Sequence, residues 1–78
     1  MRTLSEITKE IKADWKNPSA YAKPYLDAMS TLKTVNDNYW HDSGREIVLR
    51  FLCNASTWRG DKARAIKLEL KNMVGKTL

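Results

Sequence analysis

Cysteine, histidine and glycine are scarce in this chain of 78 residues, which holds one Cys, one His and three Gly. A single cysteine excludes an internal disulfide framework. His41 is the only histidine, and no sequence pattern links it to Cys53, so neither a multi-histidine metal site nor a His–Cys–Asp catalytic set has support in the sequence. The glycines stand singly at positions 44, 60 and 75, so the chain has no glycine-rich phosphate-binding loop. We therefore expect a protein that is not an enzyme and uses no metal or cofactor.

Long apolar runs are also missing from the sequence. No stretch approaches the roughly 18 apolar residues of a transmembrane helix. The N-terminal segment carries Glu6, Lys9 and Glu10 where a signal peptide would have its apolar region. Cys53 falls within an apolar helical segment, which predicts a buried, reduced thiol. These features predict a cytoplasmic protein that does not enter the membrane.

What the sequence does have is apolar residues at helical spacing, in four segments. Thr3 and Glu6 have the spacing of a capping box and begin the first helix, which Asn17-Pro18 ends. Pro24 suits the first turn of a second helix, where its missing N–H costs nothing. A helical turn just before this proline would make the second helix short or kinked.

The third helical segment has the cleanest apolar pattern of the chain. Ser43 and Glu46 repeat the capping-box spacing at its start, with Asp42 as a competing cap, and Gly60-Asp61 begins a fourth helix. Because the third segment is the most apolar, it should lie at the centre. The sequence thus predicts an all-α fold, with one helical domain over residues 1–78. We expect a small compact bundle of three main helices plus a short or kinked one, with helix 44–56 central.

Two breaks between helices carry the candidate partner-binding residues. In residues 54–61, Trp58 extends the apolar stripe of the third helix and should plug the end of the core, while Arg59 is free for an exposed contact. In residues 36–42, Tyr39 and Trp40 stand beside His41 in a polar loop, where exposing two large aromatic rings is costly. They either fold over the bundle as a lid or form a contact patch.

Basic residues dominate the charge, which is +5 overall. Residues 59–78 contain six basic and two acidic residues. An anionic partner would suit this end of the chain, so a basic nucleic-acid-binding accessory protein is the alternative function. The same residues also suit a solvated helix face, and no Asn or Gln stands near the start of the last helix to read adenine. The candidate nucleic-acid-binding residues are Lys62, Arg64, Lys67 and Lys71.

Two segments carry a family resemblance. The residues 21–29 (YAKPYLDAM) and the residues 47–60 (IVLRFLCNASTWRG) resemble a group of short, uncharacterised proteins of phages and other mobile elements of Gram-positive bacteria. The resemblance implies a small host-directed protein, a class that includes inhibitors of bacterial defence such as anti-CRISPR proteins. It implies no catalytic or binding residue. A strongly basic chain is not a DNA mimic, so such an inhibitor would have to cover an acidic protein surface or a nucleic-acid complex.

We therefore predict a non-catalytic protein-binding module of a phage or mobile element that inhibits a host factor. Its candidate contact residues are Arg59, Tyr39 and Trp40. A homo-oligomer whose apolar faces are completed across a two-fold axis is a third hypothesis. The sequence leaves the partner and the oligomeric state open.

Overall fold

Helix α1 (Leu4–Asp14) begins at the predicted capping box in the computed structural model, which describes residues 2–75. The Thr3 hydroxyl accepts the Glu6 backbone N–H at 3.1 Å, and the Glu6 carboxylate accepts the Thr3 N–H at 2.8 Å. The helix ends before Asn17-Pro18, because Trp15 already takes an extended backbone conformation. Its indole is buried in the core.

The other helices start where the sequence places them. Helix α2 (Lys23–Met29) has Pro24 in its first turn, and helix α4 (Asp61–Gly75) begins directly after Gly60. Helix α3 (Gly44–Cys53) is capped by Ser43, whose hydroxyl accepts the Glu46 N–H at 3.2 Å.

The predicted end of the third helix, at residue 56, is wrong. Helix α3 ends at Cys53, and Asn54 closes it by donating from its side-chain amide to the Arg50 carbonyl at 2.9 Å. The Ser19 hydroxyl then donates to the Asn54 carbonyl at 3.2 Å. These side-chain contacts replace the next helical turn.

A small hairpin, which the sequence analysis does not predict, precedes α3. Strands β1 (Asn38–Tyr39) and β2 (Asp42–Ser43) pair antiparallel, with Asn38 opposite Ser43 and Tyr39 opposite Asp42. Strands of two residues are too short to show the alternation that reveals a strand in a sequence. Within residues 2–75 the fold is thus a small bundle of four helices with one two-stranded hairpin.

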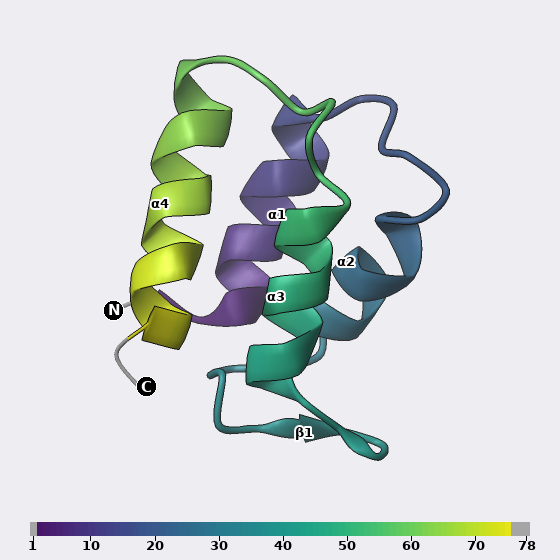
Figure 1. Ribbon diagram of the computed structural model, residues 1–78, viewed down its shortest axis with the longest axis vertical. Helices are drawn as coiled ribbons and strands as arrows, with labels where there is room; N and C mark the ends of the chain where they lie inside the picture. The colour runs from purple at the N-terminus through teal and green to yellow at the C-terminus, as the bar shows by residue number, and fades with distance from the viewer. Residues whose placement is uncertain (1, 76–78) are drawn as a thin grey trace.

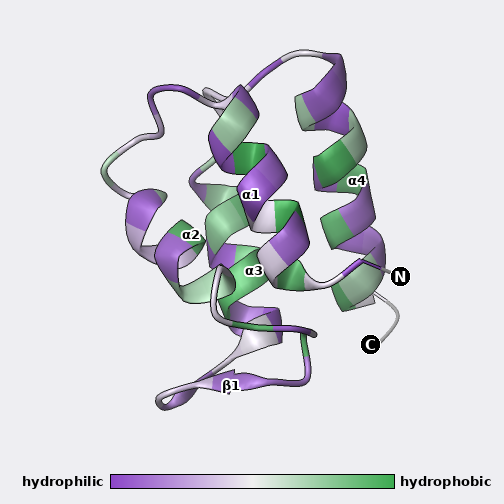
Figure 2. Cartoon of the chain, turned by 180° about the vertical axis from the view of Figure 1, so that it is seen from behind, coloured by the Kyte–Doolittle hydropathy of each residue, from purple (hydrophilic) through white to green (hydrophobic). Residues whose placement is uncertain are grey.

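The four helices surround one shared hydrophobic core. Helix α3 packs against α2 and α4, and α1 also packs against both. Figure 1 shows α3 in front of α1, and the opposite view in Figure 2 shows α1 in front of α3, with hydrophobic positions facing inward. The side chain of Phe51 is completely buried in this core. Helix α3 therefore lies across the core from α1, in contact with α2, α4 and the hairpin, rather than surrounded by the other three helices as a central helix would be.

Three aromatic rings close the end of the core near the α3–α4 connection. Trp58 is 2% exposed, as predicted, and its ring stacks on Trp15 with centroids 5.8 Å apart. Phe51 lies 6.5 Å from the Trp58 ring. The Trp58 indole N–H donates to Asp14 Oδ2 at 2.8 Å, which satisfies the polar atom of an otherwise apolar plug.

Two further sequence-based predictions concern Cys53 and the membrane. Cys53 is exposed rather than buried, because Phe51 and Ala55 occupy the core side of the chain and Cys53 points away from it. The part of the chain that the structure describes contains no helix both long and apolar enough to cross a membrane.

Candidate functional site

Trp40 is the most exposed large apolar side chain among residues 2–75. It lies at the turn of the hairpin between β1 and β2, with 85% of its surface open to solvent. The neighbouring Tyr39 is half-buried and packs against the core, and its ring meets the Trp40 ring edge-on at 6.5 Å. The two rings therefore differ: Tyr39 covers the core as a lid would, whereas Trp40 is exposed and free for contact.

The backbone of Trp40 is also unusual. Its φ is +57°, and Trp40 is the one non-glycine residue with positive φ in the described chain. This left-handed conformation costs an L-residue about 1–2 kcal/mol, and bulky residues rarely adopt it. Such conformations persist where the surrounding structure enforces them, and they concentrate at functional sites.

The loop at the base of the hairpin is held by hydrogen bonds to Asp37. The Asp37 carboxylate accepts the backbone N–H of Lys33 at 2.9 Å and that of Thr34 at 3.2 Å. These two donors lower the pKa of Asp37. The Asp37 carbonyl accepts the N–H of Gly44 at 2.6 Å, which joins the loop to the start of α3.

Gly44 lets the loop approach α3 closely. A Cβ at this position would lie 2.9 Å from the Thr34 carbonyl oxygen and 3.1 Å from the Cα of Val35. The N–H of Arg45 donates to the Val35 carbonyl at 2.9 Å, directly beside this contact. The close approach therefore requires glycine, and it fixes the platform from which the hairpin extends.

The tip of the hairpin places an exposed aromatic ring beside polar side chains. His41 is exposed and Asp42 is half-buried. Among residues 2–75, no cluster of histidine, cysteine and carboxylate side chains could hold a metal ion. A large aromatic ring with polar neighbours is typical of the anchors of protein interfaces.

The structure separates Arg59 from the aromatic pair. Arg59 lies in the connection between α3 and α4, whereas the hairpin lies at the other end of α3 (Figure 1). Arg59 is exposed and has no ion pair within the described residues. Tyr39 and Trp40 therefore form one candidate site, and Arg59 belongs to a different part of the surface.

The four basic residues of α4 have different surroundings. Lys62 faces α1 and pairs with Glu10 at 3.5 Å, and Arg64 pairs with Asp61 on its own helix. Lys71 is exposed and has no ion pair in residues 2–75.

Lys67 is tied to the end of α3. Its ammonium donates to the carbonyls of Ala55 at 2.7 Å and Trp58 at 2.6 Å, and it lies 5.8 Å from the centre of the Trp58 ring. Burial lowers the pKa of Lys67, and so do the positive charges of Lys71 and Arg59. Lys67 thus ties α4 to the segment after α3. Its place among the basic residues of α4 gives no sign of this structural role in the sequence.

The lysines of α1 do not add to the basic flank of α4. Lys12 of α1 pairs with Asp27 of α2 at 3.4 Å, so this side of α1 faces α2. Lys67 of α4 contacts the end of α3. Because α1 and α3 lie on opposite sides of the bundle, Lys12 and Lys67 face different parts of the surface (Figures 1 and 2).

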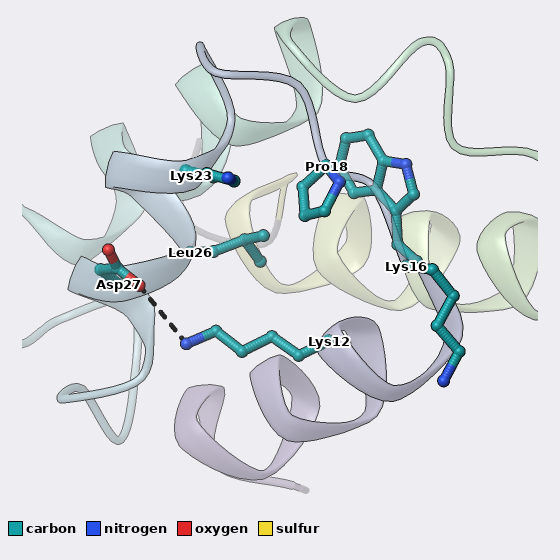
Figure 3. Close-up of a pocket in the computed structure, with 7 residues that line it drawn as sticks. Lys12, Lys16, Pro18, Lys23, Leu26 and Asp27 are labelled. Carbon is teal, nitrogen blue, oxygen red and sulfur yellow. Dashed lines mark hydrogen bonds and ion pairs between the residues drawn. The ribbon is translucent and has the colours of Figure 1, made fainter.

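A shallow cleft of about 240 Å³ lies between α1 and α2. Figure 3 shows Leu26 at its centre and the ion pair of Lys12 with Asp27 across one side, while Lys16 extends away from it. Ligand pockets usually have volumes of roughly 300–1,000 Å³, so this cleft suits at most a small fragment. The sequence gives no sign of it, because it forms where the chain leaves α1 and reverses. Its lining residues are Lys12, Trp15, Lys16, Pro18, Lys23, Leu26 and Asp27.

Comparison with known proteins adds no family to this description. No protein-family model, no curated protein and no solved structure matches the chain. The resemblance to proteins of phages and mobile elements stays a prediction. The function is therefore inferred from the residues and their geometry.

Proposed function

We propose that this protein is a non-catalytic protein-binding module of a phage or mobile element, and that it inhibits a host factor in the cytoplasm. Trp40 is its principal contact residue. The supporting observation is a tryptophan that is 85% exposed and held at a φ of +57° on a hairpin. A protein gains nothing in stability from either property, whereas a binding partner would bury the ring.

The expected contribution of Trp40 to binding is large. A tryptophan buries roughly 150–250 Å² when it is fully covered. Truncation of an anchor of this kind typically costs about 2 kcal/mol or more of binding free energy. The fixed loop beneath the hairpin reduces the entropy that is lost on binding, because the ring is already presented before contact.

The proposal is tested by affinity capture from a lysate of Gram-positive bacteria, with and without nuclease. The wild-type chain is compared with Trp40→Ala and with Tyr21→Ala as a matched control. Tyr21 is 77% exposed and lies outside the hairpin. We expect wild type and Tyr21→Ala to retain the same protein after nuclease treatment, and Trp40→Ala to lose it. Equal capture by Trp40→Ala, or loss of the partner with nuclease, would contradict the proposal.

The nucleic-acid alternative has less structural support. Of its four candidate residues, Lys67 is engaged with backbone carbonyls and Lys62 and Arg64 are in ion pairs. Proteins that bind nucleic acid through the backbone need several free cations to replace condensed counterions. Even when the exposed Arg64 exchanges Asp61 for a phosphate, Arg64 and Lys71 together leave too little charge on this flank for tight, salt-dependent binding. The nuclease arm of the capture experiment distinguishes the two functions.

A further inference from the structure

A second surface, formed by α3 and α4, has a composition that the Trp40 site does not explain. On α3, the residues Arg45, Leu49 and Leu52 follow one another at steps of four and three, so they share one side of the helix. Leu49 is 37% exposed, and Leu52 is half-buried against the core. The α3–α4 face consists of these residues together with Arg64, Leu68 and Lys71 of α4.

The α4 half of this face has the same spacing. Arg64, Leu68 and Lys71 also stand at steps of four and three. Leu68 is 60% exposed, which is unusual for a leucine in the middle of a packed helix. The face therefore has leucines in its middle and cations at its edges.

Two hydrogen bonds between α4 and the chain of α3 fix how the helices are aligned. The Arg45 side chain donates to the Val74 carbonyl at 3.4 Å, and the Lys67 ammonium donates to the Ala55 carbonyl at 2.7 Å. The helices are therefore antiparallel, with Leu49 level with Lys71. By the same alignment, Leu52 is level with Leu68, so the leucines of both helices lie at similar heights along this face.

The charge on this face is positive. Lys71 and Arg59 both lie close enough to lower the pKa of Lys67, although burial is the larger cause. Two carboxylates of these helices pair with cations outside the face, Glu46 with Arg50 and Glu69 with Arg2. Within residues 2–75, the only carboxylate paired with a cation of this face is that of Asp61, at its end.

We infer that the α3–α4 face binds an amphipathic helix of a protein partner, with apolar residues on one side and glutamate or aspartate along both flanks. The leucines would cover its apolar stripe, and Arg45, Arg64 and Lys71 would face its carboxylates. A nucleic-acid backbone would match the cations but leave the leucines without a partner. A second copy of the chain would match the leucines but bring like charges together.

This surface is separate from the Trp40 site. The hairpin extends below α3 on the side away from α4 in both views (Figures 1 and 2). Substitutions at one surface should therefore leave the other intact. Failure of this inference would not affect the function proposed for Trp40, and failure at Trp40 would not affect this one.

The test uses a synthetic 18-residue helical peptide that has leucines at helical spacing and glutamates on both flanks. A scrambled peptide of the same composition, without the apolar stripe, serves as its control. A nitroxide attached to Cys53, the single and exposed cysteine, reports proximity by broadening the peptide's NMR signals. We expect the striped peptide to bind with broadening, to shift amide signals of α3 and α4, and to bind more weakly as salt rises.

Two charge-matched variants locate the contact. Leu68→Asp should raise the Kd of the striped peptide about tenfold or more, since it removes a leucine that the bound peptide would cover. Tyr21→Asp makes the same change in charge outside the face and should have little effect. Equal weakening by both variants, equal binding of the scrambled peptide, or no binding would overturn the inference. So would tighter binding of a DNA duplex to the same amides, or self-association that covers them without peptide.

Discussion

Lys67 offers a direct test of whether the basic stripe of α4 serves the fold or a ligand. We consider Lys67→Met, which removes the charge but keeps an unbranched apolar stem beside Trp58. The wild-type ammonium donates to the Ala55 and Trp58 carbonyls at 2.7 and 2.6 Å. Both carbonyls lie just after the end of α3, so the substitution leaves them without this donor.

The expected magnitude follows from two opposing effects. Hydrogen bonds from a charged donor contribute about 1.5–3 kcal/mol each when the pair is protected from water. Lys67 is only half-buried, so water can replace part of this contribution. Burial, Lys71 and Arg59 also lower the pKa of Lys67, which means that folding penalises its charged form. We expect a net loss of about 1–2 kcal/mol of unfolding free energy.

The assay is urea unfolding followed by tryptophan fluorescence and circular dichroism, together with thermal unfolding. A loss of this size lowers the Tm of a domain this small by roughly 4–16 °C. Lys71→Met is the matched control, since it removes the same charge one turn further along α4. Lys71 is exposed and has no ion pair in residues 2–75, so its loss should change stability by less than about 0.5 kcal/mol.

The comparison can refute the structural role of Lys67. If Lys67→Met is as stable as Lys71→Met, the two carbonyls do not depend on the ammonium. If Lys67→Met is more stable than wild type, the cost of burying the charge exceeds the benefit of its hydrogen bonds. Either result would return Lys67 to the set of residues available for a ligand.

Three further predictions concern the loop, the hairpin and acid. Gly44→Ala should lower the unfolding free energy by about 1–3 kcal/mol in a urea titration, since its Cβ would lie 2.9 Å from a backbone oxygen. Gly75→Ala is the control: a Cβ there meets nothing within 4 Å, so this variant should be neutral or stabilising. Trp40→Gly should be more stable than Trp40→Ala by about 0.5–1 kcal/mol, because glycine adopts positive φ without strain, and the reverse order would show that the turn is unstrained. A hydrogen bond from the Arg2 side chain lowers the pKa of Glu10 below its ordinary value of 4.5. Backbone N–H groups lower the pKa of Asp37 below its ordinary value of 3.8. Their stabilisation is therefore complete above those values and lost as pH falls through the lower folded pKa values. Urea midpoints measured between pH 6 and pH 2 should fall at the acid end, and Asp37→Asn should reduce that fall; an unchanged pH profile would contradict the role of Asp37.

Local signals in the sequence were sufficient for the helix starts and for much of the core. Thr3, Ser43 and Pro24 act within one turn of their own positions, so a linear pattern reveals them. The burial of Trp58 follows from its place on the stripe of Phe51, which needs only helical spacing. The end of α3 was harder to predict, because it depends on Asn54 and Ser19, which are distant in sequence.

The candidate sites were less accessible to sequence reasoning. The composition of the loop indicated that Tyr39 and Trp40 matter, but not which ring covers the core and which faces solvent. That choice depends on a hairpin of two-residue strands and on the close approach of Gly44 to the Thr34 carbonyl. Arg59 was grouped with these aromatics, and the length of α3 places it at the opposite end of the molecule.

The sequence by itself determined the helical class, the helix starts and the apolar faces, because capping and periodicity act over three or four residues. The tertiary structure alone decided what each charged or aromatic side chain does. Lys67 and Lys71 share one flank of a helix, yet the end of α3 engages the first and leaves the second exposed. The physical reason is that a side chain's role depends on the carbonyls, charges and rings that other segments bring within a few ångströms, and helical spacing carries no information about them.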